Sequence, residues 1–241
     1  MSEDLESEEI FSDDSEEILE DSEESVSTEE YLEENATVIT PQNFKANISQ
    51  TDLAFIAGKR RSGKTNLIIW FIDRLTNLNA NILIIDPVLD IDEALKKLYG
   101  RADPRIVNIG YQNRTAFNSF LFKLIKKGWK GLLIIDEADG FFPNKKSMTK
   151  IEKFFIHIGR HYGIGAILVT RRMSNMNTDI ATQANIMMIF KHWQRADLDY
   201  LSQSGLIEEL PIIRKLPKHH FQYIDIDGEV SVTSKPVPKM L

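Results

Sequence analysis

The sequence predicts an α/β fold in which a mostly parallel central sheet is flanked by helices, with a β-hairpin near the C-terminus. From residue 44 onward, short apolar runs alternate with segments of helical periodicity. A glycine-rich loop separates the first apolar run from a helix-like segment. A later run ends in two acidic residues, as buried parallel strands do where their carboxyl ends meet a ligand.

The expected strands are short apolar runs, most of them too short for a helix. They cover residues 53–57, 81–86, 106–109, 131–136, 164–170 and 186–190. Near the C-terminus, residues 221–225 and 229–233 flank Asp227-Gly228, a dipeptide typical of a tight hairpin turn. We therefore expect one folded domain over residues 37–234, between a tail at 1–36 and a C-terminal tail at 235–241.

Residues 58–65, Gly-Lys-Arg-Arg-Ser-Gly-Lys-Thr, fit the G-x-x-x-x-G-K-[ST] pattern of a phosphate-binding loop. The two glycines let backbone N–H groups wrap a phosphate at the positive end of the following helix, expected over 66–75. We expect Lys64 to reach the β- and γ-phosphates and Thr65 to offer its hydroxyl to Mg²⁺. The predicted nucleotide-binding residues are Gly58, Lys59, Arg60, Arg61, Ser62, Gly63, Lys64, Thr65 and Asn66.

A pair of acidic residues after the run 131–135 supports a nucleotide site. Asp136 is expected to hold the Mg²⁺ shell together with Thr65. Glu137 follows directly, where a carboxylate can polarise water for attack on the γ-phosphate. A plain acidic loop after a core strand is the alternative, which the presence of Lys64 disfavours. ATP and Mg²⁺ are therefore the predicted cofactors.

Charge is distributed unevenly along the chain. Residues 1–44 contain 17 of the 36 acidic residues and no Lys or Arg. The remainder carries 29 basic against 19 acidic residues, a formal charge of +10, although the whole chain carries −7. A segment so charged and so poor in large apolar residues cannot offset its ordering entropy, which predicts disorder over 1–36. This tail either only aids solvation or covers a basic surface of the chain or of a partner.

Several classes of protein are excluded. No stretch approaches 18 consecutive apolar residues, and the first residues show neither a basic n-region nor an apolar h-region, so we expect neither a transmembrane segment nor secretion. The absence of Cys excludes disulfides and thiolate metal sites, and five scattered His show no metal-ligand spacing. A GTPase is disfavoured because residues 144–147, Asn-Lys-Lys-Ser, lack the acid of the base-reading motif. A DEAD-box helicase would need a second domain for which the chain has no room.

The order of these motifs resembles the HerA/FtsK superfamily of DNA-pumping ATPases, which have a RecA/FtsK-like P-loop fold. It runs from the phosphate-binding loop through residues 84–87, Ile-Ile-Asp-Pro, and 134–138, Ile-Ile-Asp-Glu-Ala, to the glycine and arginine stretch at 159–172. That last stretch is the specific part. The resemblance covers roughly residues 52–189. Within the superfamily, a minimal ATPase core is similar to the genome-packaging ATPases of double-stranded DNA viruses with internal membranes, including archaeal ones.

The resemblance implies a P-loop ATPase domain that translocates double-stranded DNA without sequence preference. It also implies a homo-oligomeric ring such as a hexamer, a capsid-vertex or membrane protein as partner, and a location in the host cytoplasm or on the virion. A viral packaging motor is the preferred hypothesis. A cellular HerA-like translocase, a small-molecule kinase and an ATP-dependent assembly scaffold remain alternatives.

The resemblance also assigns catalytic roles. The matching phosphate-binding, magnesium-binding and water-activating residues are Lys64, Thr65, Asp136 and Glu137. Arg160 matches an arginine before the sensor strand that resembles a finger reaching the nucleotide of the neighbouring subunit. A solvated helix-end arginine is the alternative. Family members commonly have a polar glutamine-type sensor where this chain has Arg171, so the division of roles among Arg160, Arg171 and Arg172 stays open.

Two basic stretches are candidates for contacts to DNA phosphates. Residues 141–150 follow the acidic pair directly and combine three lysines with Phe141 and Phe142. The alternative is that both phenylalanines are ordinary core residues under a basic turn. Residues 191–195, Lys-His-Trp-Gln-Arg, are the second candidate, although a buried tryptophan beside exposed charges explains them about as well.

Overall fold

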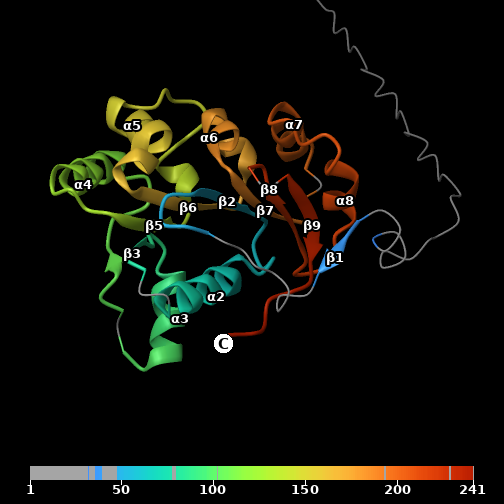
Figure 1. The fold of residues 1–241 in the computed structure, drawn as a ribbon, viewed down its shortest axis with the longest axis horizontal. Coiled ribbons are helices and arrows are strands. Elements are labelled where there is room, and N and C mark those ends of the chain that lie inside the picture. The colour runs from blue at the N-terminus through green and yellow to red at the C-terminus, as the bar shows by residue number, and fades with distance from the viewer. Residues whose placement is uncertain are drawn as a thin grey trace, which may run out of the picture.

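A nine-stranded sheet forms the centre of the computed structural model, with helices on both faces (Figure 1). The structure describes residues 32, 36–39, 48–77, 80–101, 103–192, 194–227 and 229–240. Most of the acidic segment 1–36, for which we predict disorder, lies outside the described residues. The strand order is β1-β9-β8-β7-β2-β6-β5-β3-β4. This arrangement confirms the predicted α/β fold.

All six strands expected in the parallel sheet are present. They are β2 (Leu53–Ala57), β3 (Ile82–Ile85), β4 (Ile106–Val107), β5 (Gly131–Ile135), β6 (Ile164–Thr170) and β7 (Ile186–Phe190). The sheet also contains β1 (Val38–Ile39), β8 (Phe221–Asp225) and β9 (Val230–Ser234). The hairpin of β8 and β9 extends the sheet, because β8 pairs antiparallel with β7. Strand β1, which the sequence did not predict, pairs parallel with β9.

Helices of unequal length connect the strands. They are α2 (Lys64–Asn77), α3 (Asp90–Tyr99), α4 (Arg114–Lys126), α5 (Lys150–Ile158), α6 (Thr178–Gln183), α7 (Arg195–Gln203) and α8 (Leu210–Lys215), with 3-10 turns η1 (Ala138–Gly140), η2 (Gly159–Tyr162) and η3 (Met173–Asn175). Local signals set their starts: Thr149 and Glu152 form a capping box at α5, and the Asn113 side chain accepts the N–H of Ala116 at α4. Figure 1 shows α2 and α3 on one face of the sheet and α4 to α7 on the other.

Each face of the sheet has its own hydrophobic core. Ile85 and Ile135 point into the core beneath α4 and α5, whereas Ile84 and Ile134 point into the core beneath α2 and α3. Successive side chains of a strand alternate between faces. Asp136, which follows Ile135, therefore leaves β5 on the α2 side of the sheet. Strands buried on both faces also explain why the sequence shows continuous apolar runs rather than alternation.

Strand β6 lies between β2 and β5, and its close contact with the start of β2 needs a glycine. A Cβ on Gly165 would lie 2.6 Å from the carbonyl oxygens of both Asp52 and Gln50. Any side chain there would push the strand away from its neighbour. This contact gives a physical reason for one glycine of the stretch 159–172.

The segment expected as a C-terminal tail packs on the body of the protein. The Asn66 side chain donates to the carbonyl oxygen of Pro238 at 3.0 Å and accepts the N–H of Met240 at 2.9 Å. Val237 is buried against the core of the α2 face. Residues 235–240 thus run beside the helix that carries Lys64 and Thr65 (Figure 1). In the part of the chain that the structure describes, no helix is both long and apolar enough to cross a membrane.

Candidate active site

The phosphate-binding loop connects β2 to α2 at the carboxyl edge of the sheet. The N–H of Gly58 donates to the carbonyl oxygen of Thr170 at 3.2 Å, which ties the loop to β6. A Cβ on Gly58 would lie 2.6 Å from Ser62 Oγ and 2.8 Å from Phe190 Cβ. Gly63 has a φ of 112°, which a side chain would strain. Both glycines of the motif are therefore required by the loop geometry.

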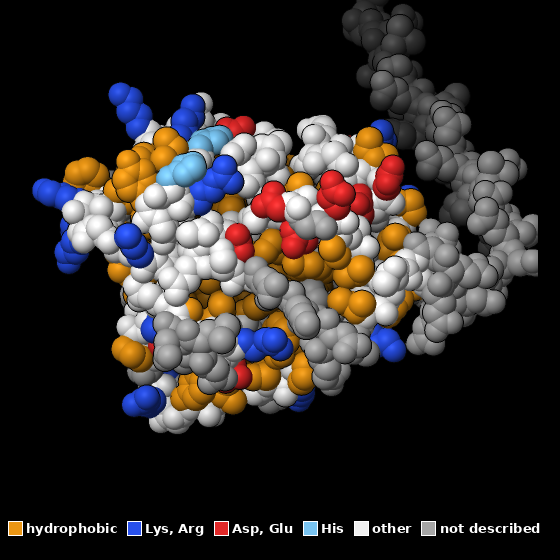
Figure 2. All heavy atoms as spheres, viewed as in Figure 1, with side chains coloured by type: hydrophobic (Ala, Val, Ile, Leu, Met, Phe, Trp, Pro, Cys, Tyr) orange, Lys and Arg blue, Asp and Glu red, His pale blue; other side chains and the backbone are white. Residues whose placement is uncertain are grey.

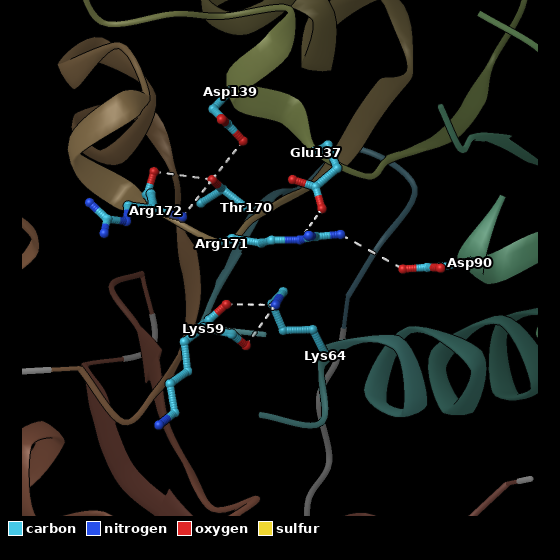
Figure 3. A network of polar contacts seen from close by, with 9 residues as sticks. Lys59, Lys64, Asp90, Glu137, Asp139, Thr170, Arg171 and Arg172 are labelled. Carbon is cyan, nitrogen blue, oxygen red and sulfur yellow. Dashed lines mark hydrogen bonds and ion pairs between the residues drawn. The ribbon is translucent and has the colours of Figure 1, made fainter. Parts of the chain in front are cut away.

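Lys64 is buried at the start of α2 and bends back over the loop. Its Nζ donates to the carbonyl oxygens of Gly58 at 2.5 Å and of Lys59 at 3.1 Å (Figure 3). Burial lowers the pKa of Lys64, and the negative charges of Asp136 and Glu137 act against this shift. The structure thus brings the ammonium and both carboxylates into one electrostatic neighbourhood.

Asp136 faces the same side of the sheet as the start of α2. The residue is 6% exposed, and burial, reinforced by the charge of Glu137, raises the pKa of its carboxyl group to about 7. Ionisation of a buried carboxyl group is costly when no cation is near, but it becomes favourable beside a divalent cation. The Asp136 carboxylate and the Thr65 hydroxyl are hard oxygen donors, so they fit the expected Mg²⁺.

Glu137 is held by an arginine from the same chain. Its carboxylate pairs with Nε of Arg171, and Nη2 of Arg171 lies 3.8 Å from Oδ2 of Asp90. Figure 3 shows the Arg171 side chain stretched between these two acids, with Lys64 below it. Burial raises the pKa of Glu137, and the charge of Arg171 opposes the shift. The carboxylate expected to activate water is therefore neutralised within the chain.

A hydrogen-bond network joins the end of β6 to the turn after β5. The hydroxyl of buried Thr170 donates to Asp139 Oδ1 at 2.9 Å and accepts the N–H of Arg172 at 3.1 Å (Figure 3). Hydrogen bonds of Thr170 thus connect the segment that carries Glu137 to the segment that carries Arg171. Neither Thr170 nor Asp139 was assigned a role from the sequence, although a threonine ending a buried apolar strand was an available signal.

Arg160 lies away from the other expected catalytic residues. It belongs to η2, at the amino edge of the sheet before β6, whereas the phosphate loop follows the carboxyl end of β2. It lines a small polar pocket of about 180 Å³ with Asp52, Asn185 and Asp227. Its guanidinium forms no ion pair with any described residue. The structure therefore does not bring Arg160 to the nucleotide loop of its own chain.

An open pocket of about 720 Å³ adjoins the phosphate loop on the α2 side. Lys64 and Thr65 lie at its polar end, and Phe221 and Val237 contribute apolar lining. His219 also lines it, and its ring nitrogen Nδ1 donates to the carbonyl oxygen of Ser62 at 3.0 Å. This size and polarity suit a nucleotide whose phosphates lie on the loop and whose base lies against the apolar wall.

The two candidate DNA stretches have different surroundings. Phe141 and Phe142 are fully buried, so the core alternative is correct for both. Lys145 and Lys146 are exposed and line a groove of about 440 Å³ that includes Tyr111. In the second stretch Lys191, His192 and Gln194 line a separate basic pocket, and Trp193 lies outside the described residues.

Known structures share this architecture. The chain is 25% identical to the genome packaging NTPase B204 from Sulfolobus turreted icosahedral virus 2 in complex with AMP, with a TM-score of 0.69 and coverage of 79% of this chain and 100% of that chain. The same figures hold for B204, the DNA-packaging ATPase from Sulfolobus turreted icosahedral virus. VirB4 of Thermoanaerobacter pseudethanolicus, 9% identical with a TM-score of 0.57 over 77% of this chain and 89% of that chain, shows the fold alone.

These matches confirm the expected resemblance to viral packaging ATPases of the FtsK/HerA type. No curated protein matches the chain. The family model described as Zonular occludens toxin (Zot) matches residues 52–225, which is more than two thirds of the sequence. The chain therefore belongs to the Zonular occludens toxin (Zot) family.

Proposed function

We propose that the chain is the ATP-hydrolysing subunit of a motor that translocates double-stranded DNA into a viral capsid. The observation that carries the proposal is the convergence of Lys64, Asp136 and Glu137 at one edge of the sheet. The likeness to B204 over its whole length adds support, since B204 structures hold ATPγS and AMP. Such a motor would act in the host cytoplasm, or on the virion, docked to a capsid-vertex or membrane protein.

The loop and Lys64 would bind the β- and γ-phosphates. The Lys64 ammonium now donates hydrogen bonds to two carbonyl oxygens of the loop. With nucleotide bound it would donate to phosphate oxygens instead, which are better acceptors for an ammonium. Thr65 and Asp136 would hold Mg²⁺, which would supply charge neutralisation. Glu137 would accept a proton from the attacking water. The apolar wall of the large pocket would take the base.

Arg171 and Arg160 would supply cations from two directions. Arg171 must release Glu137 before that carboxylate can accept a proton, and a γ-phosphate beside Lys64 offers the guanidinium another anion. Arg160 cannot serve its own loop from the amino edge, so we assign it to the nucleotide of a neighbouring subunit. This requires a head-to-tail ring, in which two different surface regions meet.

Surface charge supports such a contact. Figure 2 shows basic side chains gathered over α4 and α5, with acidic side chains clustered nearer the middle of the same face. Opposite charges on separate regions favour a heterologous interface over a two-fold one. The ring size, for which a hexamer is our expectation, follows from the angle between subunits and stays a proposal.

One DNA contact would come from the turn that carries Lys145 and Lys146. This turn is connected to the segment after β6, because the N–H of Asn144 donates to the carbonyl oxygen of Asn175 at 2.7 Å and Pro143 pairs with Met176. A conformational change at Thr170 or Arg171 would therefore be transmitted to the basic turn through these backbone hydrogen bonds. Such a connection couples the nucleotide state to a contact with DNA phosphates.

The test is steady-state ATP hydrolysis measured against protein concentration, with and without duplex DNA. Activity should rise with both, because the site needs a neighbour's arginine and the motor acts on DNA. Glu137→Gln should bind ATP with unchanged affinity but hydrolyse it about 10²- to 10⁴-fold more slowly. Activity that ignores both DNA and concentration would favour a small-molecule kinase, and ATP binding without any hydrolysis would favour an assembly scaffold.

A further inference from the structure

A strongly basic pocket lies beside the phosphate loop, at the carboxyl ends of three neighbouring strands. It has a volume of about 300 Å³, and five Lys and Arg side chains line it. Arg60 follows β2, Arg171 and Arg172 follow β6, and Lys191 follows β7. Because these strands are parallel and adjacent, their ends place the cations side by side.

The positive charge of this pocket is poorly compensated within the chain. Among the described lining residues the one acidic side chain is that of Asp197, which is buried and accepts the N–H of Ser174 at 3.0 Å. The side chains of Arg60, Arg172 and Lys191 form no ion pair with any described residue. Like charges held this close repel one another. The pocket is therefore suited to bind an anion.

The basic pocket is separate from the pocket assigned to the nucleotide. Lys64 and Thr65 line the large pocket on the α2 side of the loop, and this pocket shares no described lining residue with the basic one. The basic pocket instead adjoins the groove of Lys145 and Lys146. Ser174 lines that groove, and its N–H is bonded to Asp197 of the basic pocket. Residues bonded to each other thus line the two hollows, so an extended polyanion would reach both, whereas a single phosphate would not.

We propose that this pocket binds a backbone phosphate of duplex DNA and that the bound phosphate competes with Glu137 for Arg171. The inference rests on the proposed function and adds a partner contact and a regulatory step to the same site. Arg171 belongs to both places, since it lines the basic pocket and pairs with Glu137. A phosphodiester in the pocket draws the guanidinium away from the carboxylate. Glu137 then becomes available to water, so DNA stimulates hydrolysis.

Lys191→Glu tests the pocket, because Lys191 lies outside the phosphate loop motif in sequence and forms no ion pair with Glu137. Its matched control is Lys126→Glu, the same charge reversal at an exposed position of α4. Binding of a fluorescent duplex and ATP hydrolysis with and without DNA are measured at several salt concentrations. Lys191→Glu should weaken duplex binding about tenfold at low salt and lower the slope of log affinity against log salt by about 1. Basal hydrolysis should not fall, because a carboxylate at this position also offers Arg171 an anion, and DNA stimulation should be lost.

Each outcome separates this inference from the proposed function. If wild-type hydrolysis does not respond to DNA at all, the proposed function fails. If DNA stimulates the wild type and Lys191→Glu equally, the pocket inference is wrong and the function stands. If Lys191→Met and deletion of residues 1–34 lower basal hydrolysis alike without changing the salt slope, the acidic segment is the occupant and DNA is not. Lys191→Met, which removes the charge and keeps the stem, replaces Lys191→Glu if thermal unfolding shows that the latter is misfolded.

Discussion

Replacing Asp136 by Asn should make the protein without nucleotide and Mg²⁺ more stable at alkaline pH. Asp136 is buried at the end of β5, and its pKa is raised from 3.8 to about 7. Asparagine has the same shape and can still accept the backbone N–H of Glu137, but it never carries the charge. The substitution removes the cost of ionising a buried carboxyl group.

The magnitude follows from the two pKa values. Above pH 3.8 the unfolded chain loses the Asp136 proton, whereas the folded protein keeps it up to about pH 7. The folded state binds more protons in this window, so stability falls as pH rises through it. At about 1.4 kcal/mol for each pKa unit, the full loss is about 4 kcal/mol at pH 8. Asp136→Asn should recover about this much at pH 8 and about 0.5 kcal/mol at pH 4.

Urea unfolding at pH 4, 5, 6, 7 and 8, followed by circular dichroism, measures this gain for wild type and variant. Asp199→Asn is the control, since its exposed carboxylate pairs only weakly with Arg195 at 3.9 Å. That control should change the free energy of unfolding by less than about 0.5 kcal/mol at every pH. A gain from Asp136→Asn that does not depend on pH, or a loss at pH 8, would refute the reasoning.

Three further outcomes are expected. Arg160→Ala should keep nucleotide binding but lose ATP turnover, and mixing it with Glu137→Gln should restore part of the activity. If only Arg171→Ala loses turnover, Arg171 and not Arg160 is the arginine that acts on the neighbouring subunit's nucleotide. Deleting residues 1–34 should tighten duplex binding at low salt, because the acidic segment competes with DNA through attraction screened over about 10 Å at 0.1 M salt; equal dissociation constants would show that it only aids solvation. Asn66→Ala should loosen the C-terminal segment and weaken nucleotide binding several-fold, since each lost hydrogen bond is worth about 1 kcal/mol; unchanged amide exchange in that segment would contradict this.

The sequence predicted the parts of the fold that depend on short-range patterns. Strands β2, β6 and β7 have the expected bounds, because fully buried strands leave uninterrupted apolar runs. The phosphate loop could be recognised because its function requires glycines at fixed positions. Strand β1 could not, since two residues carry no periodicity and its pairing with β9 depends on chain ends far apart in sequence.

The parts of the site that could not be predicted depend on long-range contacts. His219 bonds to Ser62 across 157 positions of the chain, and Asn66 bonds to Pro238 across 172. The pairing of Arg171 with Glu137 depends on β6 lying beside β5, which a list of motifs does not contain. Phe141 was ambiguous because an aromatic residue next to lysines fits both a stacking platform and a core.

Strand β6 separates the two ends of the proposed catalytic apparatus. It is seven residues long and rises about 3.3 Å per residue, so η2 and the phosphate loop lie roughly 20 Å apart. No side-chain rotation spans that distance, and a sheet this deeply buried does not bend to close it. If Arg160 serves the nucleotide of a neighbouring subunit, as proposed, a subunit alone hydrolyses ATP slowly until it assembles. Unassembled copies would then consume little ATP, whatever their number.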